Sequence, residues 1–153
     1  MADVLELPHP AAFFDFAISI AVIHHLSTRE RRVNAIGSIL EILKPRSAVE
    51  RSKDCGGKAM LYVWALEQAS SRRGWDEGDA QDVIVPWVMK SKQASKVAGR
   101  TGTDEVGPKE KTYHRYYHLY KKGELEEDVL HAGGIVLESG YEKDNWWAIV
   151  GRK

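Results

Sequence analysis

Residues 14–27 read FDFAISIAVIHHLS, and this stretch decides the fold. Its first ten residues, 14–23, form a nearly unbroken apolar run with β-branched content, which is typical of a strand buried on both faces of a parallel sheet. Ser27 and Glu30 then place a hydroxyl and a carboxylate three residues apart, the pattern of a helix-capping box. A helix is therefore expected to begin directly after the strand.

The next segments complete a strand-helix-strand unit. Apolar residues recur at helical spacing up to Leu43, and Pro45 ends the helix. Residues 46–57 are polar and read as a loop, and residues 58–64, KAMLYVW, as a second buried strand. Parallel strands joined by a helix predict a βαβ unit with a right-handed crossover.

The C-terminal segment predicts a helix followed by an antiparallel hairpin. Residues 124–132 carry apolar residues on one helical face, and Gly133 and Gly134 are suitable terminators. Residues 135–138 and 146–150 read as strands joined through Gly140 and Asp144-Asn145. The expected class is thus an α/β sheet with a terminal antiparallel hairpin.

The middle of the chain is polar and locally basic. Residues 90–115 contain seven Lys or Arg against three acidic residues, and large apolar residues are scarce over residues 91–112. We expect a mobile insertion over residues 90–112. Its excess of positive charge suits an RNA contact, and a solvated insertion without a specific role is the alternative.

Bulk composition narrows the class of protein. The chain has 153 residues, enough for one compact domain, and its 22 basic and 22 acidic residues cancel, so no global basic field attracts nucleic acid. No apolar stretch approaches the roughly 20 residues of a membrane span, and no signal segment is recognised. A cytoplasmic protein, also found in the nucleus, is expected. Cys55 is the single cysteine, which excludes an internal disulfide and a Cys-based zinc cluster.

Several segments, taken in order, resemble one enzyme family. The strand that ends in His24-His25 resembles the fourth motif of the tRNA carboxymethyluridine methyltransferases, which are class I S-adenosylmethionine-dependent enzymes. Six further segments are similar to the same family: residues 64–68 (WALEQ), 70–73 (SSRR), 81–83 (QDV), 85–87 (VPW), 116–120 (YYHLY) and 138–147 (ESGYEKDNWW). The resemblance implies a Rossmann-like class I methyltransferase fold.

The resemblance also implies that only part of that fold is encoded. The family's Gly-rich turn and acidic second strand, which bind the cofactor, have no counterpart in residues 1–153, and residues 1–8 resemble the third family motif. We therefore expect a partial methyltransferase domain, the C-terminal half of the sheet, in a truncated family member. An apolar strand edge should be exposed, and cofactor affinity should be poor.

The family resemblance assigns roles to individual residues. It implies that donors for a substrate carboxylate come from His24, His25, Arg29, Arg72 and Arg73. It implies that S-adenosylmethionine is bound by Asp3, Val4, Ser19 and Ala21. It implies that the RNA substrate is bound by Trp64, Glu67, Asp82, Tyr116, Tyr117 and His118, with further stacking faces on Trp75, Trp87 and Tyr120. Plain loop histidines, exposed arginines and core-packing tyrosines are the alternatives. No recognised ligand spacing among the histidines supports a metal site.

The implied reaction is methylation of the carboxymethyl group on a wobble uridine of tRNA, which gives the methyl ester. A carboxylate is ionised at neutral pH, so this reaction needs positioning rather than a general base. The resemblance implies two partners, tRNA and a small zinc-binding activator protein. A non-catalytic RNA-binding or regulatory remnant of such an enzyme is the alternative, and a small-molecule methyltransferase is a third reading.

Overall fold

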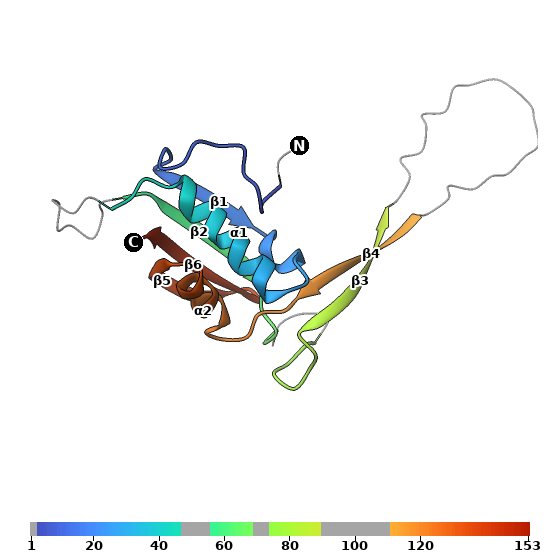
Figure 1. Ribbon diagram of the computed structural model, residues 1–153. Coiled ribbons are helices and arrows are strands. Elements are labelled where there is room, and N and C mark those ends of the chain that lie inside the picture. The colour runs from blue at the N-terminus through green and yellow to red at the C-terminus, as the bar shows by residue number, and fades with distance from the viewer. Residues whose placement is uncertain (1–2, 47–55, 69–73, 90–110) are drawn as a thin grey trace, which may run out of the picture.

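The computed structural model describes residues 3–46, 56–68, 74–89 and 111–153 (Figure 1). Its elements follow in the order β1 (Phe16–Ile20), the short 3-10 helix η1 (Ile23–His25), α1 (Arg29–Ile42), β2 (Lys58–Trp64), β3 (Asp82–Met89), β4 (Lys111–His118), α2 (Glu124–His131), β5 (Gly134–Glu142) and β6 (Asn145–Arg152).

Four of the strands form the main sheet, in the order β1-β2-β6-β5. β1 and β2 are parallel and are connected through α1, whereas β6 is antiparallel to both β2 and β5. The predicted βαβ unit and terminal hairpin are therefore confirmed. α1 and α2 lie against the sheet (Figure 1), and their apolar side chains form one core with it; its central members are Ile36, Leu40, Leu61, Val63, Leu125, Val129, Ala148 and Val150.

β1 is the end strand of this sheet in the described part of the chain. On one of its faces Phe16, Ile18 and Ile20 are 53%, 61% and 54% exposed, whereas Ser19 on the other face is buried. The prediction of a strand buried on both faces is wrong, because the described helices cover only one face. The expected exposed apolar strand edge is confirmed.

Two local predictions need correction. The N-cap of α1 is Thr28, whose hydroxyl accepts a hydrogen bond from the Arg31 N–H at 3.3 Å, so the helix begins one residue later than a cap at Ser27 would give. The connection between β5 and β6 does not include Gly140. That glycine is paired with Trp147 inside the ladder, where a Cβ would lie 2.7 Å from the indole ring. The chain turns instead at Lys143 and Asp144, which both have positive φ.

β3 and β4 form a separate two-stranded antiparallel ribbon, called the arm here, which extends away from the main sheet (Figure 1). β3 was not predicted, because Pro86 interrupts its sequence. A two-stranded ribbon tolerates this proline, since no third strand needs its missing N–H. Lys111 and Thr112, expected in a mobile insertion, belong to β4. The other residues of that insertion, and residues 47–55 of the predicted loop, lie outside the described residues.

No described helix has the length and apolar character needed to cross a lipid bilayer.

Candidate active site

An aromatic cluster lies where the carboxyl ends of β1 and β2 meet the arm. Trp64 ends β2, and Tyr117 on β4 stacks on its indole with ring centroids 4.3 Å apart and planes 10° apart. His24, in η1 just after β1, lies 5.5 Å from the Trp64 ring and 5.2 Å from the Tyr117 ring. The carboxyl edge of parallel strands is where open α/β sheets bind ligands. His24, Trp64 and Tyr117, all predicted site residues, are thus brought together.

His24 is a buried, neutral imidazole. The backbone N–H of Trp64 donates to its Nδ1 at 3.1 Å, so Nδ1 carries no proton and the proton of the neutral ring is on Nε2. Burial, with the nearby His25 and His118 as smaller causes, lowers the pKa of His24 to about 3. Nε2 is buried and has no hydrogen-bond partner among the described residues. The ring therefore presents an uncharged N–H donor at neutral pH.

This protonation state makes folding stability depend on pH. The folded-state pKa of about 3 lies below the usual 6.5, so between these values the unfolded chain binds more protons than the folded one. The contribution of His24 is complete above pH 6.5 and is lost as the pH falls toward 3. From pH 6.5 to 4.5, the unfolding free energy of the wild type should fall by about 2 to 3 kcal/mol more than that of a His24→Gln variant. Urea unfolding of both proteins measures this difference, and equal slopes would refute the assignment.

His25 is oriented for contact with a ligand. Its Nδ1 lies 2.9 Å from the carbonyl oxygen of Tyr116, which can only accept, so Nδ1 must donate. Its ring lies 4.4 Å from that of Tyr117. Nε2 makes no hydrogen bond within the described part of the chain, and His25 is only half-buried. This nitrogen is therefore available to a ligand beside the Trp64–Tyr117 stack.

A polar cluster fixes the base of the arm. His118 contacts two carboxylates at once, Asp82 at 2.8 Å and Glu124 at 2.7 Å. Tyr116 donates to the same Asp82, and this bond and the bond to His118 lower the pKa of Asp82. Burial, followed by the bond to Asp82, raises the pKa of Tyr116 to about 12. Asp82, Tyr116 and His118 bind one another, with Gln81 as a further member, and their predicted role in substrate binding stays a prediction.

Two further predicted site residues make contacts within the fold, and their predicted roles stay predictions. Arg29 donates to Asp128 of α2 at 2.8 Å and pairs with Glu127 at 3.3 Å, so its guanidinium joins α1 to α2. Glu67 accepts from the Lys122 N–H and from the Trp146 indole, each at 3.0 Å. These bonds occupy the charged groups of Arg29 and Glu67. Arg72 and Arg73 lie outside the described residues, so their predicted role is untested.

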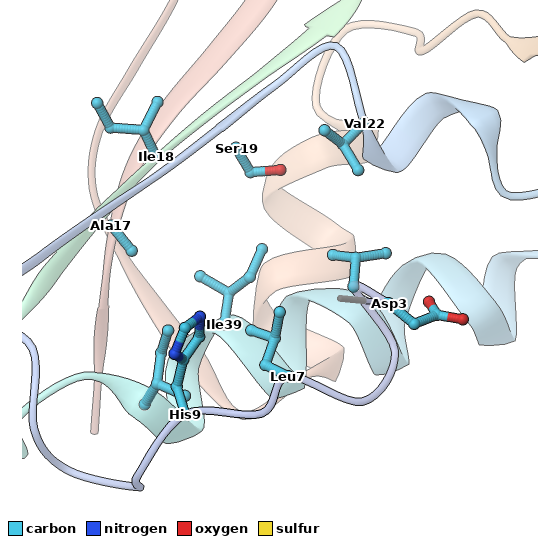
Figure 2. Close-up of a pocket in the computed structure, with 10 residues that line it drawn as sticks. Asp3, Leu7, His9, Ala17, Ile18, Ser19, Val22 and Ile39 are labelled. Atoms are coloured by element: carbon cyan, nitrogen blue, oxygen red, sulfur yellow. The ribbon is translucent and has the colours of Figure 1, made fainter. Parts of the chain in front are cut away.

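A pocket of about 540 Å³ lies between the N-terminal segment, β1 and α1 (Figure 2). Its walls are mainly apolar, with Val4, Leu7 and Val22 among them, and Asp3 lies at its side. Ser19 lines it as well, and the Ser19 hydroxyl is buried with no partner among the described residues. The structure thus brings three of the four predicted cofactor residues together.

Ala21 is not part of this pocket lining. It has a φ of +56°, an uncommon value for a residue with a side chain, and its N–H donates to the Tyr62 carbonyl at 3.0 Å. The backbone therefore turns sharply at the end of β1 and leads directly into η1.

Sequence reasoning did not place Trp87 beside Arg115 on the arm. The sequence offers the first as an aromatic and the second as part of a basic tract. Residues 111, 113, 115 and 117 alternate basic and aromatic with a period of two, which is the signal that places them on one face of a strand. The partners of the polar cluster, such as Glu124, are distant in sequence from Asp82 and left no local signal.

Two similar proteins found by sequence comparison share one name. No protein-family model matches the sequence. The tRNA (carboxymethyluridine(34)-5-O)-methyltransferase of Schizosaccharomyces pombe is 48% identical over 98% of this chain, which spans 62% of that relative. The protein of the same name from Saccharomyces cerevisiae is 39% identical, and the alignment covers all of this chain and 67% of the relative.

Solved structures agree on the fold. An S-adenosylmethionine-dependent methyltransferase from Clostridium acetobutylicum has a TM-score of 0.61 at 11% identity and covers 98% of this chain and 62% of its own. The CcbJ methyltransferase from Streptomyces caelestis has a TM-score of 0.62 at 8% identity, with coverage of 100% and 66%. At such identities these matches show the fold alone. The two yeast relatives show that the chain belongs to the tRNA (carboxymethyluridine(34)-5-O)-methyltransferase family.

Proposed function

We propose that this chain takes part in S-adenosylmethionine-dependent methylation of the carboxymethyl group on wobble uridine in tRNA, in the cytoplasm. The observation that carries the proposal is the His24-His25 pair beside the Trp64–Tyr117 stack, at the carboxyl edge of the parallel strands. The relatives that are 48% and 39% identical bear the name of this activity.

The pocket beside β1 suits the adenine part of the cofactor. Adenine is a flat ring with an amino group that donates and ring nitrogens that accept. Apolar walls from Val4, Leu7 and Val22 would cover the ring. Oδ1 of Asp3 accepts from the Leu5 N–H at 3.0 Å, and Oδ2 would accept from the amino group. The Ser19 hydroxyl would supply a donor. When bound, S-adenosylmethionine supplies a methyl group on a positively charged sulfur.

The aromatic cluster suits the base and its carboxymethyl group. The half-buried Trp64 offers a stacking surface, which single-stranded RNA bases use widely. A carboxylate has a pKa of about 4, so it is ionised at neutral pH and needs no base to activate it. In its imidazolium form, with a proton on each ring nitrogen, His25 would donate from Nε2 to one carboxylate oxygen and leave the other free to react. The chain's task is therefore orientation and charge stabilisation.

A small zinc-binding activator protein, implied by the family resemblance, belongs to the proposal as a second partner. Such a partner would cover an exposed apolar surface, and β1 offers one on the face that carries Phe16, Ile18 and Ile20. Burial of these side chains by the partner would remove unfavourable contact with water.

The test is transfer of an isotopically labelled methyl group from S-adenosylmethionine to an anticodon stem-loop RNA that carries 5-carboxymethyluridine at the wobble position. We expect label in the RNA that is released by mild base, because the product is an ester. A stem-loop with plain uridine is the control, since it lacks the carboxylate. A folded chain that binds the RNA and transfers no methyl group would contradict the proposal and support a non-catalytic RNA-binding role.

A further inference from the structure

One face of the arm carries alternating aromatic and basic side chains. In the β3–β4 ladder Tyr113 is paired with Trp87, Arg115 with Val85 and Tyr117 with Val83. Alternate residues of a strand share a face, so the outer part of this face carries Trp87, Tyr113, Arg115 and Lys111. We call these four residues the arm stripe.

The side chains of the arm stripe are arranged as cations over aromatic rings. The Arg115 guanidinium carbon lies 4.2 Å from the Trp87 ring centroid, and the Lys111 ammonium lies 5.0 Å from that of Tyr113. The two rings are 6.0 Å apart. Trp87 is 40% exposed and Tyr113 is 38% exposed. Both rings and both cations are therefore accessible along one open surface.

The charge of this face favours an anionic ligand. Asp82 is the single carboxylate in the described strands of the arm, and the register places it on the opposite face, where it is bound to Tyr116 and His118. Arg115 and Lys111 thus have no acidic neighbour on their own face of these described strands. Aromatic rings with nearby cations and no carboxylates are the combination by which proteins bind single-stranded nucleic acid.

The arm stripe continues into the candidate active site. Tyr117 lies on the same face of β4 as Tyr113 and stacks on Trp64 beside His25. Four residues along a strand cover about 14 Å, a distance that a few unpaired nucleotides span. A strand of RNA whose target base lies at Trp64 and His25 would place its neighbouring nucleotides on the arm.

We propose that the arm stripe binds the unpaired nucleotides that adjoin the target base, with bases stacked on Trp87 and Tyr113 and phosphates paired with Arg115 and Lys111. The proposal rests on the proposed function in one respect, namely that the substrate is RNA. It assigns the arm a role in holding the anticodon loop, separate from the methylation chemistry.

The test measures binding of a fluorescein-labelled anticodon stem-loop RNA to the full chain, without cofactor, by anisotropy. We expect a Trp87→Ala/Arg115→Gln variant to bind at least tenfold more weakly, because a stacking surface and a phosphate contact are both lost. Its affinity should also depend less on salt. The slope of the logarithm of the binding constant against the logarithm of the salt concentration should be smaller in magnitude by about 1, because one phosphate contact is lost. The substitutions should have little effect on the binding of a fully paired RNA duplex, which has no unpaired bases.

The matched control is Val88→Ala/Thr112→Ala, a pair on the opposite face of the same ribbon. This variant should bind the stem-loop within about twofold of the wild type, because it removes neither a stacking surface nor a phosphate contact. Equal affinity of the arm-stripe variant and the wild type for the stem-loop would overturn the proposal. An equal loss of affinity in both variants would also overturn it, and so would a wild type that does not bind the stem-loop.

The results distinguish a failure of the arm's role from a failure of the proposed function. Methyl transfer with unchanged RNA binding by the arm-stripe variant would reject the role of the arm and keep the enzyme. Arm-dependent RNA binding without methyl transfer would keep the arm and reject the enzyme.

Discussion

Replacement of His25 by alanine is expected to lower kcat/KM for methyl transfer to carboxymethyluridine RNA by about a hundredfold, the usual effect of removing one positioned donor next to reacting atoms. The Nδ1–H of His25 is bound to the Tyr116 carbonyl at 2.9 Å, so the ring is fixed before substrate arrives. The Nε2–H of the imidazolium form then donates to the carboxylate without loss of further conformational freedom. Removal of the ring loses both the contact and this preorganisation.

The matched control is His131→Ala, which removes an exposed histidine at the end of α2. It should leave methyl transfer unchanged. Steady-state rates against RNA concentration, with separate calorimetry for S-adenosylmethionine, should show that His25→Ala binds the cofactor normally. A rate within about threefold of the wild type would contradict the role assigned to His25, because loss of even a single hydrogen bond to a charged group has a larger effect than that.

Local patterns predicted the elements of the main sheet well. Three signals were local: the apolar run before His24, the proline at position 45 that ends the helix, and the glycines after α2. Each is contained in a few consecutive residues. The environment of β1 could not be predicted in the same way, because burial depends on which elements cover a strand. A sequence of apolar residues is the same whether its second face is covered or exposed.

The candidate site could be predicted only in part, because local patterns do not show which distant residues surround a side chain. His24, His25 and Trp64 come together because they follow or end neighbouring strands, which sequence order already indicates. The ion pairs of Arg29 could not be predicted, because the carboxylates that bind it belong to α2, about a hundred residues away in the chain. Long-range pairing of this kind leaves no local pattern in one sequence.

Asp128 holds two cations of α1, and its loss is expected to destabilise the fold strongly. It is fully buried, accepts from Arg29 at 2.8 Å and lies 3.8 Å from Nε of the buried Arg32. The Tyr120 hydroxyl donates to Oδ2 of Asp128 at 3.4 Å. Burial is the largest cause that raises the pKa of Tyr120, and the negative charge of Asp128 is the second. Asp128→Ala would leave Arg32 as a buried cation whose remaining partners among the described residues are Glu124, at 3.6 Å, the Leu26 carbonyl, at 3.4 Å, and the Tyr120 ring.

Breaking a buried ion pair from one side costs about 3 to 5 kcal/mol, a large share of the roughly 5 to 15 kcal/mol that stabilises a typical domain. The control is Glu127→Ala, which removes an exposed partner of the same Arg29 and should cost at most about 1 kcal/mol. Urea unfolding at neutral pH separates the two variants. Similar midpoints would show that Arg32 is satisfied without Asp128. A large difference would mean that this one carboxylate fixes α2 against α1, and with α2 the Glu124 that binds His118 at the base of the arm.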